Sequence, residues 1–400
     1  MRAVWHQARC IARPPRPPRP RTLKPYGLRW FSLDPRYDIP LRILFCGTDE
    51  FSATSLKTLH NYREISDGHI ASIDVATKTD KRVGRGLKQI ASPPIKTLAR
   101  ELDLPLHQFD TFTSWSPPAN SSINLVIAVS FGLKVPPRIL RACEFGGLNV
   151  HPSLLPDLKG ASPIESAIIH GYKQTGVTVQ TLHLTKFDEG QVLAQTSRMT
   201  IPQPDYITAK QLRGLLAPVG ANLLVQTLDQ RLYLEPPKST IDLKLSYMHT
   251  APKLSPETRH VDFANMSASH ICRLHRAVPK LWFMARQGED NTTSLRVVLE
   301  EGVRQAQDFD LAGLDESLLA SVRIGIPFAF VPVRQNLSES KASLLVKTAE
   351  GSILSVSELT VAGKRKAPSV AALAQAQLFS KVVEVGTVKL CELRPPVMSI

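Results

Sequence analysis

Short apolar runs alternate with helical patterns between Leu41 and Leu228, and this alternation constrains the fold more than any other feature. Alternating strands and helices form a parallel sheet with helices on both faces, and ligands bind beyond the carboxyl ends of its strands. Strands are expected at residues 41–46, 70–76, 123–129, 147–150 and 177–184. Helices are expected at 51–59, 95–102, 137–142, 163–170 and 209–228. The pattern predicts a Rossmann-like α/β domain.

The sequence changes in character after residue 230. Residues 231–246 include Pro236 and Pro237 and few large apolar side chains, so they are expected to form a linker. Short apolar runs joined by polar turns then follow, and they are typical of a small β-barrel of the oligonucleotide-binding (OB) type. These runs lie at 297–299, 328–331, 343–346 and 353–356. We expect an α/β domain at 39–230 and an OB-like β-barrel domain at 247–400.

The N-terminal segment differs from both domains in its charge. Of the formal net charge of +14, the first 33 residues supply +8, from seven arginines and Lys24 with no Asp or Glu. An Arg-rich, acid-poor N-terminus is typical of a mitochondrial transit segment. The proline-rich stretch 13–20 cannot be helical, so a disordered linker is the alternative. We expect residues 1–38 to direct the protein to the mitochondrial matrix.

Cysteine spacing and hydropathy argue against several other classes. The five cysteines are scattered without a Cys-x-x-Cys pair, so we expect reduced core thiols and neither a disulfide framework nor a zinc site. His260, His270 and His275 have no cysteine or carboxylate partner at ligand spacing, and no metal is expected. No apolar run is long enough to span a bilayer. We therefore expect a soluble monomer without a membrane partner.

The strongest chemical signal lies in residues 146–156 and 187–190. Asn149 and His151 are two apart at the end of a strand pattern, so both side chains project from one face. Together with Asp188 they suit attack on a carbonyl, because donors stabilise the oxyanion while a carboxylate manages a proton. The structural alternative is a hydrogen-bonded histidine at a strand end and an aspartate that caps a helix.

These motifs resemble those of a known family. Asn149-Val150-His151, Ser153-Leu154-Leu155-Pro156 and Asp188-Glu189-Gly190 follow the N-x-H, S-L-L-P, D-x-G order of the folate-dependent formyltransferases. Phe45-Cys46-Gly47-Thr48-Asp49-Glu50-Phe51 is similar to the F-x-G-T-P-x-F start of the methionyl-tRNA formyltransferases, with Asp49 in place of proline. The resemblance extends over most of the chain from Leu41, because Ala251-Pro252-Lys253-Leu254 and Gly363-Lys364-Arg365-Lys366 are similar to later family motifs.

The resemblance implies a reaction. The formyl donor would be 10-formyltetrahydrofolate and the acceptor the α-amine of methionyl initiator tRNA. Attack by the amine builds a tetrahedral carbon, so Asn149 and His151 are the expected donors to its oxyanion. Asp188 is expected to fix the imidazole and to take the amine proton, directly or through water.

The resemblance also implies a folate pocket. Its expected residues are Phe131, Gly132, Ser153, Leu154, Leu155 and Pro156. The chain departs from the family here, since Asp157-Leu158-Lys159-Gly160 stands where close relatives have R-W-R-G, and Ser130-Phe131-Gly132 stands for A-Y-G. The loss of an aromatic ring and a positive charge bears on contacts with the RNA end more than on catalysis.

A basic loop suggests the partner. Residues 78–88 hold five basic side chains against Asp80 alone and resemble the insertion loop that the family uses against the tRNA acceptor stem. Lysine and arginine on a flexible segment can follow a phosphate backbone, although a solvated surface loop is the alternative. The expected tRNA-binding residues are Lys78, Lys81, Arg82, Arg85, Lys88, Lys364, Arg365 and Lys366.

Three other functions share part of this pattern. A formyltransferase for a nucleotide-sugar amine or glycinamide ribonucleotide would keep Asn149, His151 and Asp188 but would not need the basic loop. A folate hydrolase would use water as the nucleophile. A non-enzymatic RNA-binding protein would leave the three residues without a purpose.

Overall fold

A computed structural model describes residues 34–118, 120–235, 248–287, 293–311 and 316–394. Internal contacts divide the chain into residues 1–39 and residues 40–400. The described part of the first unit is a short 3-10 helix, Pro35–Asp38. The predicted transit segment up to residue 33 lies outside the described residues.

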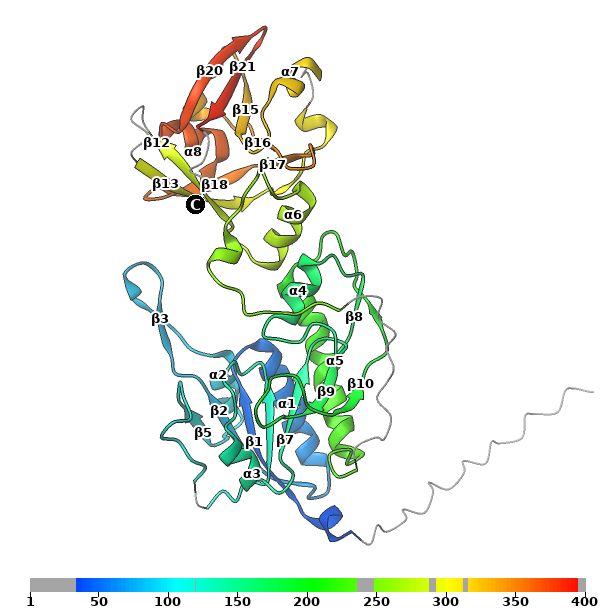
Figure 1. Cartoon of the computed structure of the whole chain (residues 1–400). Coiled ribbons are helices and arrows are strands. Elements are labelled where there is room, and N and C mark those ends of the chain that lie inside the picture. The colour runs from blue at the N-terminus through cyan, green and yellow to red at the C-terminus, as the bar shows by residue number, and fades with distance from the viewer. Residues whose placement is uncertain (1–33, 119, 236–247, 288–292, 312–315, 395–400) are drawn as a thin grey trace, which may run out of the picture. The chain divides into compact units, whose positions relative to one another are not determined.

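A seven-stranded sheet forms the centre of the first domain (Figure 1). Its order is β10-β9-β7-β6-β1-β2-β5. The strands are β1 (Leu41–Gly47), β2 (Ile70–Thr77), β5 (Leu106–Gln108), β6 (Leu125–Val129), β7 (Gly147–His151), β9 (Thr178–Thr181) and β10 (Val192–Gln195).

The first five strands in sequence order run parallel, as the alternation of strands and helices predicts. Strands β9 and β10 run antiparallel to their neighbours, which the alternation did not predict. The reason is that Thr178 pairs with His151, so β9 begins opposite the end of β7 instead of crossing back to its start. A parallel neighbour needs such a crossover.

Five helices cover the sheet, close to their predicted positions. They are α1 (Glu50–Ile65), α2 (Pro94–Glu101), α3 (Pro137–Ala142), α4 (Pro163–Ile169) and α5 (Ala209–Asp229). Asp49, which replaces the proline of the resembling family, is the N-cap of α1, and its side chain accepts a hydrogen bond of 3.1 Å from Ser52 N. This cap satisfies a helix N–H that would otherwise lack a partner.

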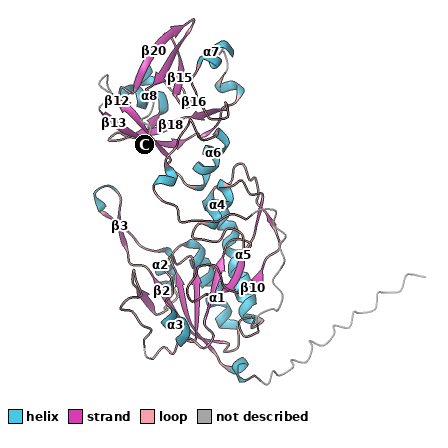
Figure 2. Cartoon of the chain, viewed as in Figure 1, coloured by secondary structure: helices cyan, strands magenta, loops and turns pink. Residues whose placement is uncertain are grey.

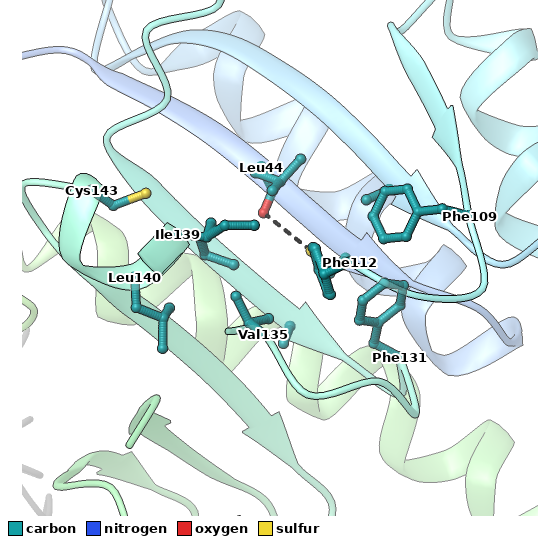
Figure 3. Packing of buried hydrophobic residues seen from close by; sticks show 12 residues of the cluster. Leu44, Phe109, Phe112, Phe131, Val135, Ile139, Leu140 and Cys143 are labelled. Carbon is teal, nitrogen blue, oxygen red and sulfur yellow. Dashed lines mark hydrogen bonds between the residues drawn. The ribbon is translucent and has the colours of Figure 1, made fainter. Parts of the chain in front are cut away.

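Alternate residues of the strands pack against the two sides of the sheet. Gly220 of α5 approaches Phe51 and Val150 on one face. On the other face, Leu44 of β1 packs with α3 and with the aromatic residues Phe109, Phe112 and Phe131 (Figure 3). Because successive side chains of a strand point to opposite faces of the sheet, this alternation decides which residues pack on each face.

A two-stranded hairpin, β3 (Lys81–Val83) and β4 (Gln89–Ala91), follows β2 and is linked by a 3-10 turn, Arg85–Leu87. Figure 1 shows it as a narrow arm that extends away from the sheet. Most of the basic loop predicted at 78–88 therefore forms part of a β-hairpin. Its turn depends on Gly84 and Gly86, which have φ values of 79° and 72°.

The second domain is predominantly β, as Figure 2 shows. One antiparallel sheet has the order β12-β13-β18-β19 and the other β14-β17-β16-β15-β21-β20. The strands of the first are β12 (Trp282–Gln287), β13 (Thr293–Glu301), β18 (Glu358–Val361) and β19 (Ala367–Pro368). Those of the second are β14 (Arg304–Gln305), β15 (Pro327–Pro332), β16 (Leu344–Lys347), β17 (Ile353–Val356), β20 (Phe379–Val385) and β21 (Val388–Leu393).

Helices also occur in this domain, and the strand pattern did not predict them. They are α6 (Ala268–Ala277), α7 (Glu316–Ser321) and α8 (Ser369–Gln375). The predicted strands at 297–299, 328–331, 343–346 and 353–356 all lie within or close to observed strands. A small pair, β8 (Gln174–Thr175) and β11 (Met199–Thr200), completes the described strands.

The predicted linker begins later than expected. Tyr233 and Leu234 are buried, and the Tyr233 hydroxyl lies 3.1 Å from His69 Nε2, so packing of the first domain continues to this point. Residues 236–246 lie outside the described residues. The four cysteines within the described part of the chain are free and buried, as expected, and Cys10 lies outside it. Among the described helices, none is both long and apolar enough to cross a membrane.

Candidate active site

The end of β7 positions two polar side chains beside each other. Leu148 and Val150 are buried in the core, so Asn149 and His151 project to the opposite face. Strand β6 pairs with β7 only as far as Val150, so His151 lies beyond its last paired residue. Such a position, at the carboxyl end of a parallel strand, is where α/β domains place their ligand sites.

Asp188 joins these two residues, as the motif order predicts. Its Oδ1 accepts a hydrogen bond of 3.3 Å from Asn149 Nδ2 and lies 3.5 Å from His151 Nδ1. The side chains of His151 and Asp188 are only 5% and 8% exposed, and Asn149 is half-buried. Two residues of β7 and one residue distant in sequence therefore form one compact polar cluster.

Two further groups hold the Asp188 carboxylate, and sequence reasoning missed both. Gln180 Nε2 donates to Oδ1 at 3.0 Å, and Gly160 N donates to Oδ2 at 2.9 Å. Gln180 is the cross-strand partner of Asn149. The available signal was a glutamine within an apolar strand pattern, because a buried amide needs polar partners.

The loop that carries Asp188 packs tightly on β9. A Cβ on Gly190 would lie 1.6 Å from Thr181 O, so any larger residue would push the loop away. Asp188 itself has a φ of 51°. The Asp-x-Gly motif thus has a steric reason in addition to its carboxylate.

Both ring nitrogens of His151 face acceptors. Nε2 lies 2.9 Å from Leu158 O, which can only accept, so Nε2 carries a proton and donates it. Nδ1 faces Asp188 at a distance longer than a good hydrogen bond. Because Nε2–H is engaged by Leu158 O, Nδ1 is the ring nitrogen left to donate to a substrate oxygen, and it can do so when it carries a proton.

The residues expected to line the folate pocket differ in their exposure. Phe131 packs in the core with Phe109 and Phe112, so its side chain serves the fold (Figure 3). Gly132 has a φ of 68°, and the Lys78 ammonium lies 2.8 Å from the place of a Cβ. Of the other four expected residues, Ser153, Leu154 and Leu155 are buried and Pro156 is exposed, and the Leu155-Pro156 peptide bond is cis.

The expected tRNA-binding residues fall into two places. Lys81, Arg82 and Lys88 are exposed on the hairpin, Arg85 lies in its turn, and Lys78 precedes it in a half-buried position. Burial and the nearby Lys253 and Lys81 lower the pKa of Lys78. Lys81 is within 3.4 Å of Asp110.

The second group is in the second domain. Lys364, Arg365 and Lys366 are exposed in the turn between β18 and β19. Lys366 Nζ lies 2.6 Å from Glu301 and 2.8 Å from Glu358, and these carboxylates raise its pKa. Its charge is thus largely offset, and Lys364 and Arg365 are the better candidates for phosphate contact.

A cavity of about 370 Å³ is lined by Asp110, Thr113, Lys134 and Arg138 among others. It contains none of the three predicted catalytic residues, so we assign it no part in the chemistry. Within the described ranges, no group of three or more His, Cys, Asp or Glu side chains could hold a metal ion.

Comparison with known proteins identifies relatives of the chain. A family model described as "Formyl transferase" matches residues 41–228, and one described as "Formyl transferase, C-terminal domain" matches residues 253–377. The mitochondrial methionyl-tRNA formyltransferase of Saccharomyces cerevisiae is 33% identical over 307 residues, covering 66% of this chain and 75% of that protein. Its Homo sapiens counterpart is 30% identical over 278 residues, covering 68% of this chain and 66% of that protein.

Similar solved structures include HypX from Aquifex aeolicus in complex with tetrahydrofolic acid. It is 17% identical with a TM-score of 0.45, and the match covers 88% of this chain and 51% of that one.

Proposed function

The chain belongs to the formyl transferase family, and we propose that it transfers the formyl group of 10-formyltetrahydrofolate to the α-amine of methionyl initiator tRNA. The product, formylmethionyl-tRNA, serves translation initiation in mitochondria. The observation that carries the proposal is the convergence of Asn149, His151 and Asp188 at the end of β7.

The reaction forms a bond between the amine nitrogen and the formyl carbon and breaks the bond from that carbon to N10 of the folate. Asn149 Nδ2 donates to the oxyanion that develops, and His151 Nδ1–H is the second donor. Asp188 receives the proton that leaves the attacking nitrogen and then gives that proton, directly or through water, to N10 as it departs. The Leu158 carbonyl and the Gly160 and Gln180 N–H groups keep these side chains in place.

The tRNA is bound through the hairpin residues 81–91, with Lys364 and Arg365 as a second contact. Exposed cations on a narrow arm can reach a phosphate backbone, and the amine must be placed at Asn149 while the acceptor stem is held elsewhere. The relatives in Saccharomyces cerevisiae and Homo sapiens are mitochondrial, which supports a mitochondrial location. We propose a monomer in the matrix, without a metal or a membrane partner.

A direct assay tests this function. The chain from Asp34 onward is incubated with 10-formyltetrahydrofolate and charged initiator tRNA, and formylmethionine is measured after release from the tRNA. Parallel reactions contain glycinamide ribonucleotide or a nucleotide-sugar amine as the acceptor, and a reaction in buffer without an acceptor is the control. Formylation of a small amine, or release of formate without transfer, in place of formylmethionine would refute the proposal.

A further inference from the structure

The catalytic loop, residues 157–162, is hydrogen-bonded to an interdomain segment, residues 249–251. Leu158 N donates to His249 O at 2.9 Å, and Ala251 N donates to Lys159 O at 2.7 Å. Gly160 allows the two backbones to meet, since a Cβ there would lie 2.2 Å from Ala251 O. The segment leading into the second domain is thus paired with the loop like a neighbouring strand.

The same catalytic loop supplies two contacts to the active site. The Leu158 carbonyl holds His151 Nε2 at 2.9 Å, and the Gly160 N–H holds Asp188 Oδ2 at 2.9 Å. Any movement of the loop therefore moves the partners of both catalytic side chains. A displacement of about 1 Å can lower a catalytic rate by about two decades.

A buried carboxylate joins the loop to the segment. Asp157 is 4% exposed, and its Oδ1 accepts hydrogen bonds from the Tyr172 hydroxyl at 3.0 Å and from His249 N at 2.9 Å. The Tyr172 oxygen also lies 3.0 Å from His249 Nδ1. Because a buried carboxylate without donors is very unfavourable, Asp157 favours the arrangement in which the interdomain segment is docked.

Apolar packing surrounds this cluster. The Tyr172 ring packs against Leu158, Ala167 and Ala251, and His170 stacks on His249 with ring centroids 4.0 Å apart.

We propose that Asp157 and Tyr172 are positioning residues that clamp the interdomain segment onto the catalytic loop and so hold His151 and Asp188 in their reactive geometry. The proposal rests on the formyl transfer proposed above. It makes docking of residues 249–251 a condition for full turnover, although these residues do not touch the reacting atoms.

Steady-state kinetics of four variants test the clamp. Asp157→Ala should lower kcat about 10- to 100-fold with a smaller change in the KM for folate. Asp157→Asn should recover part of the loss, because its amide oxygen can still accept. Tyr172→Phe, which keeps the packed ring, should lower kcat by a smaller factor. Tyr206→Phe is the control, since Tyr206 is 76% exposed and should behave like the wild type.

A double-mutant cycle separates positioning from a general structural role. If Asp157 acts through the active site, Asp157→Ala should cost much less in a His151→Ala background than in the wild type. Full additivity, or wild-type kcat in a folded Asp157→Ala protein, would overturn the clamp. If Asp157→Ala does not fold, an unchanged kcat in Tyr172→Phe would overturn the clamp instead. Absence of formylation by the wild type is a separate result, and it would count against the proposed function.

Discussion

At the scale of single residues, the site depends on a carboxylate surrounded by N–H groups. Asp188 receives donors from Asn149, Gly160 and Gln180 and also faces His151. These partners come from β7, the catalytic loop and β9, so each fixes the carboxylate from a different direction. Preorganised groups of this kind reduce the reorganisation needed in the transition state.

Removing an oxyanion donor should slow the chemical step. Asn149→Ala and His151→Ala should each reduce transition-state stabilisation by about 2.7 to 4 kcal/mol, with folate affinity little changed. Single-turnover rates and folate titration measure the two effects separately. Asp188→Asn should reduce transition-state stabilisation by at least as much, because an amide cannot take the proton from the attacking amine. Turnover close to that of the wild type in any of these variants would remove that residue from the mechanism.

Gln180 is predicted to act on the same step through Asp188. Gln180→Leu replaces the amide donor with an apolar side chain of similar size and should lower kcat by roughly 10- to 100-fold, since a hydrogen bond to a charged group contributes about 1.5 to 3 kcal/mol. Gln180→Glu is the matched comparison and should lose more, because it places a second carboxylate against Asp188. Equal rates for wild type and both variants would show that the other donors are sufficient.

At the scale of elements, the hairpin and helix α6 each carry a group of titratable or charged side chains with a testable role. The hairpin exposes the cations Lys81, Arg82 and Lys88. Helix α6 instead carries His270 and His275, and burial is the main cause that lowers the pKa of both side chains.

Loss of hairpin cations should weaken tRNA binding in a salt-dependent way. Each lost phosphate contact should flatten the log–log salt dependence by roughly one unit, so Arg82→Ala with Lys88→Ala should flatten it by about two. Binding is measured over a salt series, with the exposed Lys57→Ala on α1 as a control for loss of a positive charge outside the hairpin. Superimposable lines for all proteins would mean that the hairpin is only a solvated arm.

Acidification should destabilise the protein partly through His275. Burial lowers the pKa of this ring below its ordinary value of 6.5, with Glu300 opposing the shift and Arg276 adding to it. The unfolded chain then binds the proton first, so the stabilisation is complete above 6.5 and decreases as the pH falls below it. His275→Gln should therefore show a shallower fall of Tm with decreasing pH. Parallel curves would exclude this contribution.

At the scale of the whole molecule, we propose that formyl transfer and mitochondrial targeting depend on separate parts of the chain. The catalytic cluster lies within the region that matches the formyl transferase family, and the basic N-terminal segment precedes it. A transit segment acts through its charge before the mature protein folds.

Charge removal in the N-terminal segment should therefore affect location only. A fusion of residues 1–38 to a fluorescent protein should enter mitochondria, and replacement of the seven arginines in the first 33 residues by glutamine should prevent it. The same replacement in the full chain should leave formylation in vitro unchanged. Import of the arginine-free fusion into mitochondria would exclude a targeting signal that depends on these charges.

The local sequence pattern was sufficient to predict the alternation of strands and helices. It was also sufficient to predict that Asn149 and His151 share one face of a strand, because successive side chains of a strand point to opposite faces. It also indicated Asp188 through the motif order. The antiparallel direction of β9, the Gln180 and Gly160 donors, and the pairing of Asp157 with His249 were decided only by the tertiary structure. Each of these joins residues distant in sequence, and no local propensity specifies which distant backbone or side chain will supply a buried group with its partner.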